Sequence, residues 1–199
     1  MQEIIKNSLE SSVSYSSYRG QISEMLENQK LDGLPPDDLI HYTLLNETRM
    51  NRLEKTMVVT PESKNVLGTL LNQYTWLVLS EGWCGDAAQI LPILDKMAEV
   101  AANITLKIVF RDQDEPLMNL FLTNGAKSIP KLIVLDSENR VVADWGPRPK
   151  GAAELIKRYK AEFGAIDETA VNELQLWYLH DKGVSTQQEI CNLMQNVDQ

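Results

Sequence analysis

Four short runs of apolar residues have the length and composition of β-strands. Residues 76–80 read WLVLS, a continuous apolar stretch that is typical of a buried central strand. Residues 104–110 read ITLKIVF, which alternates and is rich in β-branched side chains. Two further strands are predicted at 131–135 and 141–145, and the intervening turn sequence DSEN favours an antiparallel hairpin.

Helical patterns precede, separate and follow these strands. Thr60 and Pro61 provide the N-cap hydroxyl and the first-turn proline of a helix start. Further helices are predicted over 87–101, 116–122, 150–163, 168–180 and 186–196. From residue 61 onward, strands alternate with helices until the final hairpin. This order predicts an α/β fold, with a mixed sheet, a parallel portion and helices on both faces.

Residues 1–60 read as polar and helical, with a break at residues 34–38, LPPDD, ahead of a new helix. In that helix, a narrow apolar stripe at three- and four-residue spacing is predicted to pack on another surface. Its members are Leu39, Tyr42, Leu45, Arg49 and Leu53. The stripe fits the protein's own core and a separate partner equally well.

The length of 199 residues supports one core domain with appendages. We predict a helical N-terminal extension over 1–59, the α/β domain over 60–164, and C-terminal helices packed on the core over 165–199. A hydrophobic content of 43% suffices for a real core and excludes bulk disorder.

Charge and composition narrow the function classes. The net charge is −9, and the positive residues are scattered, which argues against nucleic acid or an anionic membrane surface as the main partner. The sequence contains no apolar stretch of about 20 residues and no signal-like start, so we expect a cytoplasmic protein. The two cysteines and two histidines have no zinc spacing, and we expect neither a metal nor a cofactor.

One segment carries chemistry. Residues 81–88, EGWCGDAA, place Cys84 between the central strand and the start of a helix. The unpaired N–H groups and the dipole of a helix N-terminus stabilise a thiolate, so this position is expected to lower the pKa of the Cys84 thiol. The thiolate is the nucleophile of cysteine chemistry, and Cys84 is therefore the candidate reactive residue.

The sequence Trp83-Cys84-Gly85-Asp86 is followed by Pro92 and later by Ser128-Ile129-Pro130 before a strand. These three separated signals resemble the thioredoxin family over roughly residues 60–163. The resemblance implies a thioredoxin-like fold, with Pro92 as the helix-kinking proline and Pro130 as the cis-proline beside the active-site cysteine. The flanking helices are similar to a bacterial thioredoxin-like subgroup whose motif typically reads WCGDC.

Two positions depart from the family pattern. The second redox cysteine is replaced by Ala87, and the aspartate that thioredoxins bury six residues before the first cysteine is Val78. A dithiol cycle needs a resolving thiol close to the first one, which an alanine cannot supply. Cys191 lies on an apolar stripe and is interpreted mainly as a core residue, with a resolving role as the alternative.

The leading hypothesis is therefore a monothiol thiol–disulfide redox protein with Cys84 as nucleophile. Its partner would be a protein disulfide or a low-molecular-weight thiol, and an external thiol would resolve the mixed disulfide. The expected substrate-binding residues are Trp83, Gly85, Asp86, Ile129 and Pro130. One alternative is a non-catalytic peptide-binding module, and another is an interaction protein that uses the helical arm. The sequence does not settle the oligomeric state.

Overall fold

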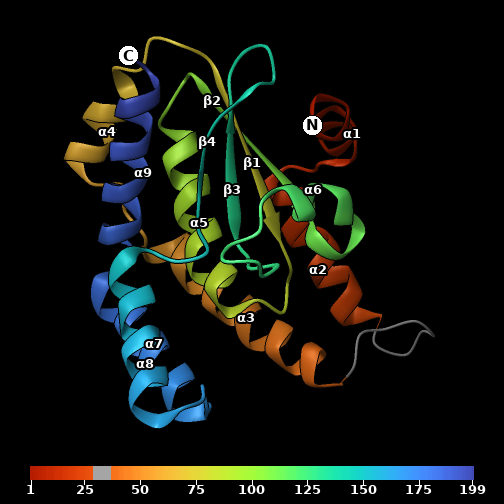
Figure 1. Ribbon diagram of the computed structural model, residues 1–199, viewed down its shortest axis with the longest axis vertical. Helices are drawn as coiled ribbons and strands as arrows, with labels where there is room; N and C mark the ends of the chain where they lie inside the picture. The colour runs from red at the N-terminus through yellow and green to blue at the C-terminus, as the bar shows by residue number, and fades with distance from the viewer. Residues whose placement is uncertain (29–36) are drawn as a thin grey trace.

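The structure is a computed structural model that describes residues 1–28 and 37–199 (Figure 1). The predicted break at residues 34–38 lies outside the described residues at positions 34–36, and the helix after it is described from Asp37. The helices are α1 (Gln2–Ser11), α2 (Tyr15–Glu27), α3 (Asp37–Thr56), α4 (Pro61–Gly68), α5 (Gly85–Glu99), α6 (Glu115–Leu120), α7 (Lys150–Phe163), α8 (Glu168–Asp181) and α9 (Val184–Val197). The strands are β1 (Tyr74–Ser80), β2 (Ile104–Phe110), β3 (Lys131–Leu135) and β4 (Val141–Trp145).

The four strands form one mixed sheet in the order β2-β1-β3-β4. β1 pairs parallel with β2 and antiparallel with β3, and β3 and β4 form the predicted antiparallel hairpin. A short antiparallel bridge between Val13 and Ile108 adds the α1–α2 connection to the outer edge of β2. The predicted α/β thioredoxin-like fold is confirmed.

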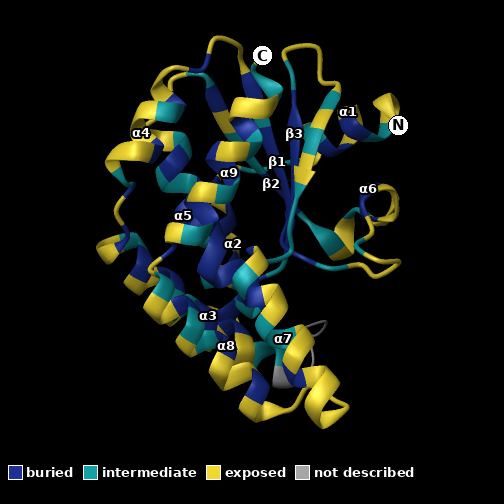
Figure 2. Ribbon diagram, turned by 60° about the vertical axis from the view of Figure 1, so that its left-hand side comes forward, coloured by how far each residue is buried: buried dark blue, intermediate teal, exposed yellow. Residues whose placement is uncertain are grey.

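Helices cover both faces of the sheet. In Figure 1, α4, α5 and α9 lie on one side of the strands, and α1, α2 and α6 lie on the other. α7 and α8 form a helical pair that extends away from the sheet beside α3, and their outer surfaces are largely exposed (Figure 2). The motif segment at 81–84 therefore lies where β1 ends and where α3 and α8 approach the first turn of α5.

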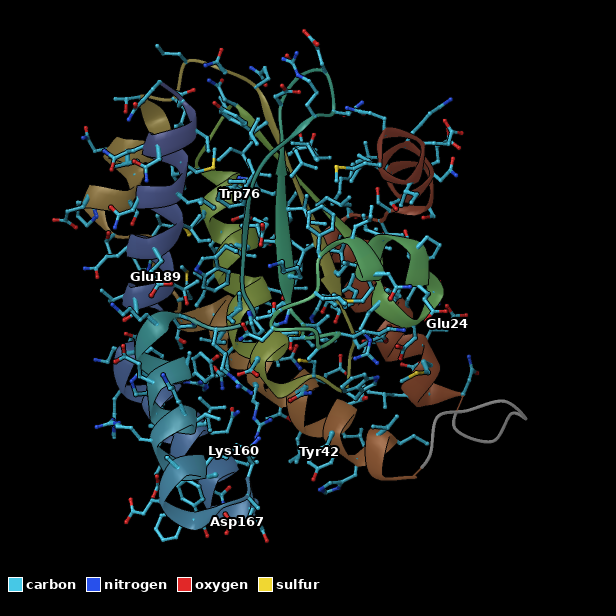
Figure 3. The ribbon with its side chains drawn as sticks, in the orientation of Figure 1. Glu24, Tyr42, Trp76, Lys160, Asp167 and Glu189 are labelled. Atoms are coloured by element: carbon cyan, nitrogen blue, oxygen red, sulfur yellow. The ribbon has the colours of Figure 1, made fainter. Side chains whose placement is uncertain are left out.

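The core is centred on β1, which is buried on both faces as its continuous apolar sequence predicts. Trp76, Leu77, Val78 and Leu79 are fully buried. The Trp76 indole N–H donates to the sulfur of Met194 at 3.3 Å, on the α9 side of the sheet (Figure 3). Val78, where thioredoxins have an aspartate, is paired with apolar residues on both neighbouring strands.

The N-terminal helices pack onto this same core. Ile5, Tyr18, Ile22 and Met50 are buried in one hydrophobic cluster with the strands. The stripe predicted in α3 is wrong at Tyr42 and Leu45, which are exposed, and right at Leu53, which is buried. The buried face reaches Leu53 through Thr43, Asn46 and Met50. The arm thus covers the protein's own core through a partly polar helix face.

Candidate functional site

Cys84 is the N-cap residue of α5, at the end of β1. Its sulfur accepts the N–H of Ala87 at 3.5 Å, and its thiol donates to the carbonyl oxygen of Ile129 at 3.4 Å. The peptide bond between Ile129 and Pro130 is cis. The structure therefore brings together three of the residues predicted for the site, namely Cys84, Ile129 and Pro130.

The expectation of a lowered Cys84 pKa is wrong. Only 8% of Cys84 is exposed, and burial, together with the negative charge of Asp86, raises the pKa of its thiol to about 12. The N–H groups of Ala87 and Asp86 and the charge of Arg148 act in the opposite direction but do not balance the loss of solvation. The thiol is therefore protonated at neutral pH.

Asp86, one of the expected substrate-binding residues, is bonded within the protein itself. Its side chain is buried in a small polar cluster that joins α5 to α8 and to the β4–α7 loop. Its Oδ2 accepts from the Arg148 guanidinium at 2.7 and 2.8 Å, and its Oδ1 accepts from the Tyr178 hydroxyl at 2.8 Å. This ion pair fixes the loop beside the motif and places a cation near Cys84.

The β4–α7 loop reads Gly146-Pro147-Arg148-Pro149 and lies directly against Pro130. Gly146 has φ +123°, and a Cβ there would overlap the Pro130 carbonyl oxygen. Ile129 and Pro130 are both buried, so the backbone at this proline is less open than the sequence suggested. Sequence reasoning missed Arg148 and Tyr178, although an arginine between two prolines after the last strand was a usable signal.

Trp83 and Gly85 complete the predicted set. Trp83 is half-buried, and the guanidinium carbon of Arg111 lies 4.8 Å from its ring centroid, which is a cation–π arrangement. One face of the Trp83 ring is therefore covered by Arg111. Gly85 faces Arg49 of α3 and Gln175 of α8, each within 3.5 Å of where a Cβ would stand.

The other cysteine does not share these contacts. Cys191 is buried in α9, and its thiol lies 4.0 Å from the carbonyl oxygen of Ser63 in α4, whereas Cys84 is bonded to Ile129. Both thiols are free. Among residues 1–28 and 37–199, no group of three or more histidine, cysteine or acidic residues is arranged to hold a metal ion.

The fold and the cysteine-bearing helix start, with a cis-proline beside it, define a thioredoxin-like protein. A family model described as thioredoxin matches residues 35–160, more than half of the chain, and the chain therefore belongs to this family. A search of curated proteins found no match.

Two solved structures show the same fold. One is a protein of unknown function from Pseudomonas aeruginosa, which is similar with a TM-score of 0.62 and 15% identity, over 94% of this chain and 95% of that chain. The other is an HIV epitope scaffold, with a TM-score of 0.56 and 17% identity over 92% of this chain and 99% of that chain. None of the helices that the structure describes is both long and apolar enough to cross a membrane.

Proposed function

We propose that the protein is a monothiol thiol–disulfide redox protein that acts through Cys84. The observation that carries this proposal is the position of the sulfur, which accepts the Ala87 N–H at the start of α5 and lies against the carbonyl of Ile129, next to Pro130. A partner sulfur that displaces the Ile129 carbonyl oxygen would approach the Cys84 sulfur at the N-terminus of α5. The proposed partner is a protein disulfide or the disulfide of a small cytosolic thiol.

The proposed reaction is a single exchange. The Cys84 thiolate attacks one sulfur of the partner disulfide, a new Cys84–sulfur bond forms, and the other partner sulfur leaves as a thiolate. Ala87 cannot attack this mixed disulfide, so an external thiol releases the partner by the same chemistry. Because burial raises the pKa of Cys84, we propose that exchange is slow at neutral pH and accelerates with alkali.

The test is glutathionylation by glutathione disulfide, followed by intact and peptide mass spectrometry from about pH 7 to about pH 10. The Cys191→Ser variant reports on Cys84 alone, and Cys84→Ser is the matched control. We expect one glutathione on Cys84, with a rate that rises about tenfold per pH unit without a plateau, because the thiolate fraction grows in that way below the pKa. Absence of the Cys84 adduct at the highest pH would contradict thiol chemistry.

A second candidate is a peptide-binding module without turnover, in which the region of Trp83 and Pro130 holds a partner chain. The raised pKa of Cys84 and the alanine at position 87 favour it. The same two variants separate the candidates: partners of a binding module are retained by Cys84→Ser, whereas partners of a redox protein are lost with the thiol.

A further inference from the structure

A cleft of about 540 Å³ lies between α3, α5 and α8, and two of its lining residues, Arg49 and Gln175, lie next to Gly85 of the motif. Its polar wall includes Arg49 and Arg52 of α3, Gln89 of α5 and Gln175 of α8. The cleft is open to solvent rather than enclosed and most of its exposed lining is apolar, and its volume lies within the range of roughly 300–1,000 Å³ that small-ligand sites occupy. In Figure 2, α8 runs next to α3 in the lower part of the view.

The two arginines of this cleft have no acidic partner among the residues that the structure describes. They are three residues apart and therefore share one face of α3. The acids nearest to them on the helix, Glu47 and Glu54, are both bound to Arg19 of α2. A half-buried arginine, Arg49, and an exposed one, Arg52, therefore line one cleft without an ion pair to any described residue, in a protein whose net charge is −9.

A chain of two hydrogen bonds connects Arg49 to the motif. Asn46, which is fully buried, donates to the carbonyl oxygen of Gly82 at 2.9 Å. The Asn46 Oδ1 in turn accepts from Arg49 Nη1 at 2.7 Å. Burial and the charge of Arg52 lower the pKa of the Arg49 guanidinium, so these surroundings disfavour its positive charge. An anion between the two guanidinium groups would relieve that repulsion.

The other residues that line the cleft indicate the chemistry of the rest of the ligand. Gln89 is buried and donates to Gln175 Oε1 at 2.8 Å, which fixes the amide wall of the cleft. Leu176 and Leu179 of α8 also line the cleft, with 52% and 45% of their surfaces exposed. Guanidinium groups match the geometry of carboxylate and phosphate oxygens, and exposed leucines match an apolar body.

We propose that this cleft binds a small organic anion, with a carboxylate or phosphate group on Arg49 and Arg52 and an apolar portion against Leu176 and Leu179. The site is separate from the proposed thiol chemistry and requires no reaction at Cys84. It adjoins the motif through Gly85, whose backbone lies against Arg49 and Gln175.

The experiment is a two-dimensional NMR titration of the Cys84→Ser protein, so that thiol chemistry plays no part. The probes are hexanoate and hexyl phosphate, with hexanol and inorganic phosphate as controls for the apolar and the charged portion alone. We expect saturable shifts of the Gly85 amide and of neighbouring α3 and α8 amides with one or both amphiphilic anions. The comparison between those two probes identifies the preferred oxyanion.

Variants test the arginines. Arg52→Gln and Arg49→Lys are each expected to weaken binding about tenfold, since each removes a charge-assisted or forked contact. Arg158→Gln, an exposed arginine of α7 outside the cleft, is the matched control and is expected to bind as before. Without ligand, Arg52→Gln is expected to raise the Tm, because like-charge repulsion is removed, whereas a merely structural arginine would lower it.

Three outcomes would overturn the proposal. The first is the absence of saturable shifts up to about 10 mM of either anion. The second is equal binding of hexanol, which would make the cleft apolar only. The third is equal weakening by Arg158→Gln, which would reduce the effect to general surface charge.

Discussion

Asp86 and Arg148 have opposite effects on the Cys84 thiol. The Asp86 carboxylate raises the pKa of this thiol and the Arg148 guanidinium lowers it, while both are held in the same ion pair. We therefore predict that Asp86→Asn lowers the Cys84 pKa and that Arg148→Gln raises it. Iodoacetamide alkylation of Cys84 against pH measures both, with faster labelling at a given pH for Asp86→Asn and slower labelling for Arg148→Gln.

The same two variants should also differ in their unfolding free energies. Arg148→Gln leaves a buried carboxylate with only the Tyr178 hydroxyl, whereas Asp86→Asn leaves an arginine that is partly exposed and can reach water. We expect the first to lower the unfolding free energy by about 2–4 kcal/mol and the second by less. Tyr178→Phe is the control for the unfolding free energy, because it removes one hydrogen bond and no charge.

Equal rates of Cys84 labelling in Asp86→Asn, Arg148→Gln and Tyr178→Phe would contradict the predicted shifts of the Cys84 pKa.

Ala87 is the residue that limits the proposed chemistry to one thiol. Its N–H already donates to Cys84 Sγ, so a sulfur at position 87 would lie one helical turn into α5 beside that thiol. We predict that Ala87→Cys forms a reversible disulfide with Cys84 and gains catalytic reduction of a protein disulfide in the presence of dithiothreitol. The measurement is insulin-precipitation turnover, with Ala88→Cys as the matched control. Equal turnover by the two variants would argue against a site organised around Cys84.

At this scale the sequence predicted where Cys84 lies but not the acidity of its thiol. The position of Cys84 at a helix start follows from the strand-then-helix pattern, and the N–H contact confirms that part of the argument. The extent of burial and the orientation of Asp86 depend on α8 and on the β4–α7 loop, which lie more than 60 residues away in the chain. Local sequence carries no signal for such long-range solvation, and so the predicted direction of the pKa shift was wrong.

The predicted bounds of helices and strands are most accurate where the hydrophobic periodicity of the sequence is unambiguous. The predicted bounds of β2, β3, β4 and α7 match the structure residue for residue. α3 shows where periodicity fails, because its buried face includes Thr43 and Asn46. The Thr43 hydroxyl bonds to the Leu39 carbonyl, and Asn46 bonds to Gly82. Satisfied polar groups can be buried, and a hydrophobic pattern cannot detect them.

The β4–α7 loop depends on Gly146. Its φ of +123° disfavours any side chain, and its Cα approaches the Pro130 carbonyl too closely for a Cβ. We predict that Gly146→Ala lowers the unfolding free energy by about 2 kcal/mol or more and shifts the amide resonances of Arg148 and Cys84. Chemical denaturation and NMR provide the two measurements.

Gly20 is the matched control for this substitution. It lies inside α2, no atom within 4 Å would meet its Cβ, and Gly20→Ala is expected to stabilise the helix by about 0.5–1 kcal/mol. Stabilisation by both substitutions would show that the loop accommodates a side chain and does not need its close contact with Pro130.

Across the whole molecule, the helical arm and the thioredoxin-like sheet share one hydrophobic core. Buried residues of α1, α2 and α3 lie in the same cluster as β1 and α5. The division of the chain at 59/60 and 164/165 stays a prediction, since a shared core does not decide whether the parts fold separately. What the sequence could not supply was the face of the sheet on which each helix packs, because that choice is made by contacts between distant segments.

The pH dependence of stability is a property of the whole molecule and has a definite sign. Burial raises the pKa of Glu81 to about 7 and that of Asp95 to about 6, so the folded state favours their protonated forms. The stability that they contribute is complete below their unfolded pKa values, 4.5 for Glu81 and 3.8 for Asp95. It is lost as pH rises through the folded pKa values, about 7 for Glu81 and about 6 for Asp95. We predict that the unfolding free energy falls from about pH 5 to about pH 8, on the order of 1 kcal/mol per group after allowing for solvent screening.

Urea unfolding across this range checks the prediction with three variants. Glu81→Gln and Asp95→Asn are each expected to flatten the decline and to stabilise the protein at the alkaline end, since the neutral side chains need no deprotonation in a half-buried site. Glu162→Gln, an exposed glutamate of α7, is expected to leave the slope unchanged. A stability that rises with pH over the same interval would contradict the prediction. It would mean that Glu81 is held as a carboxylate by the Asp112 N–H, which it accepts at 2.8 Å, more strongly than burial disfavours its charge.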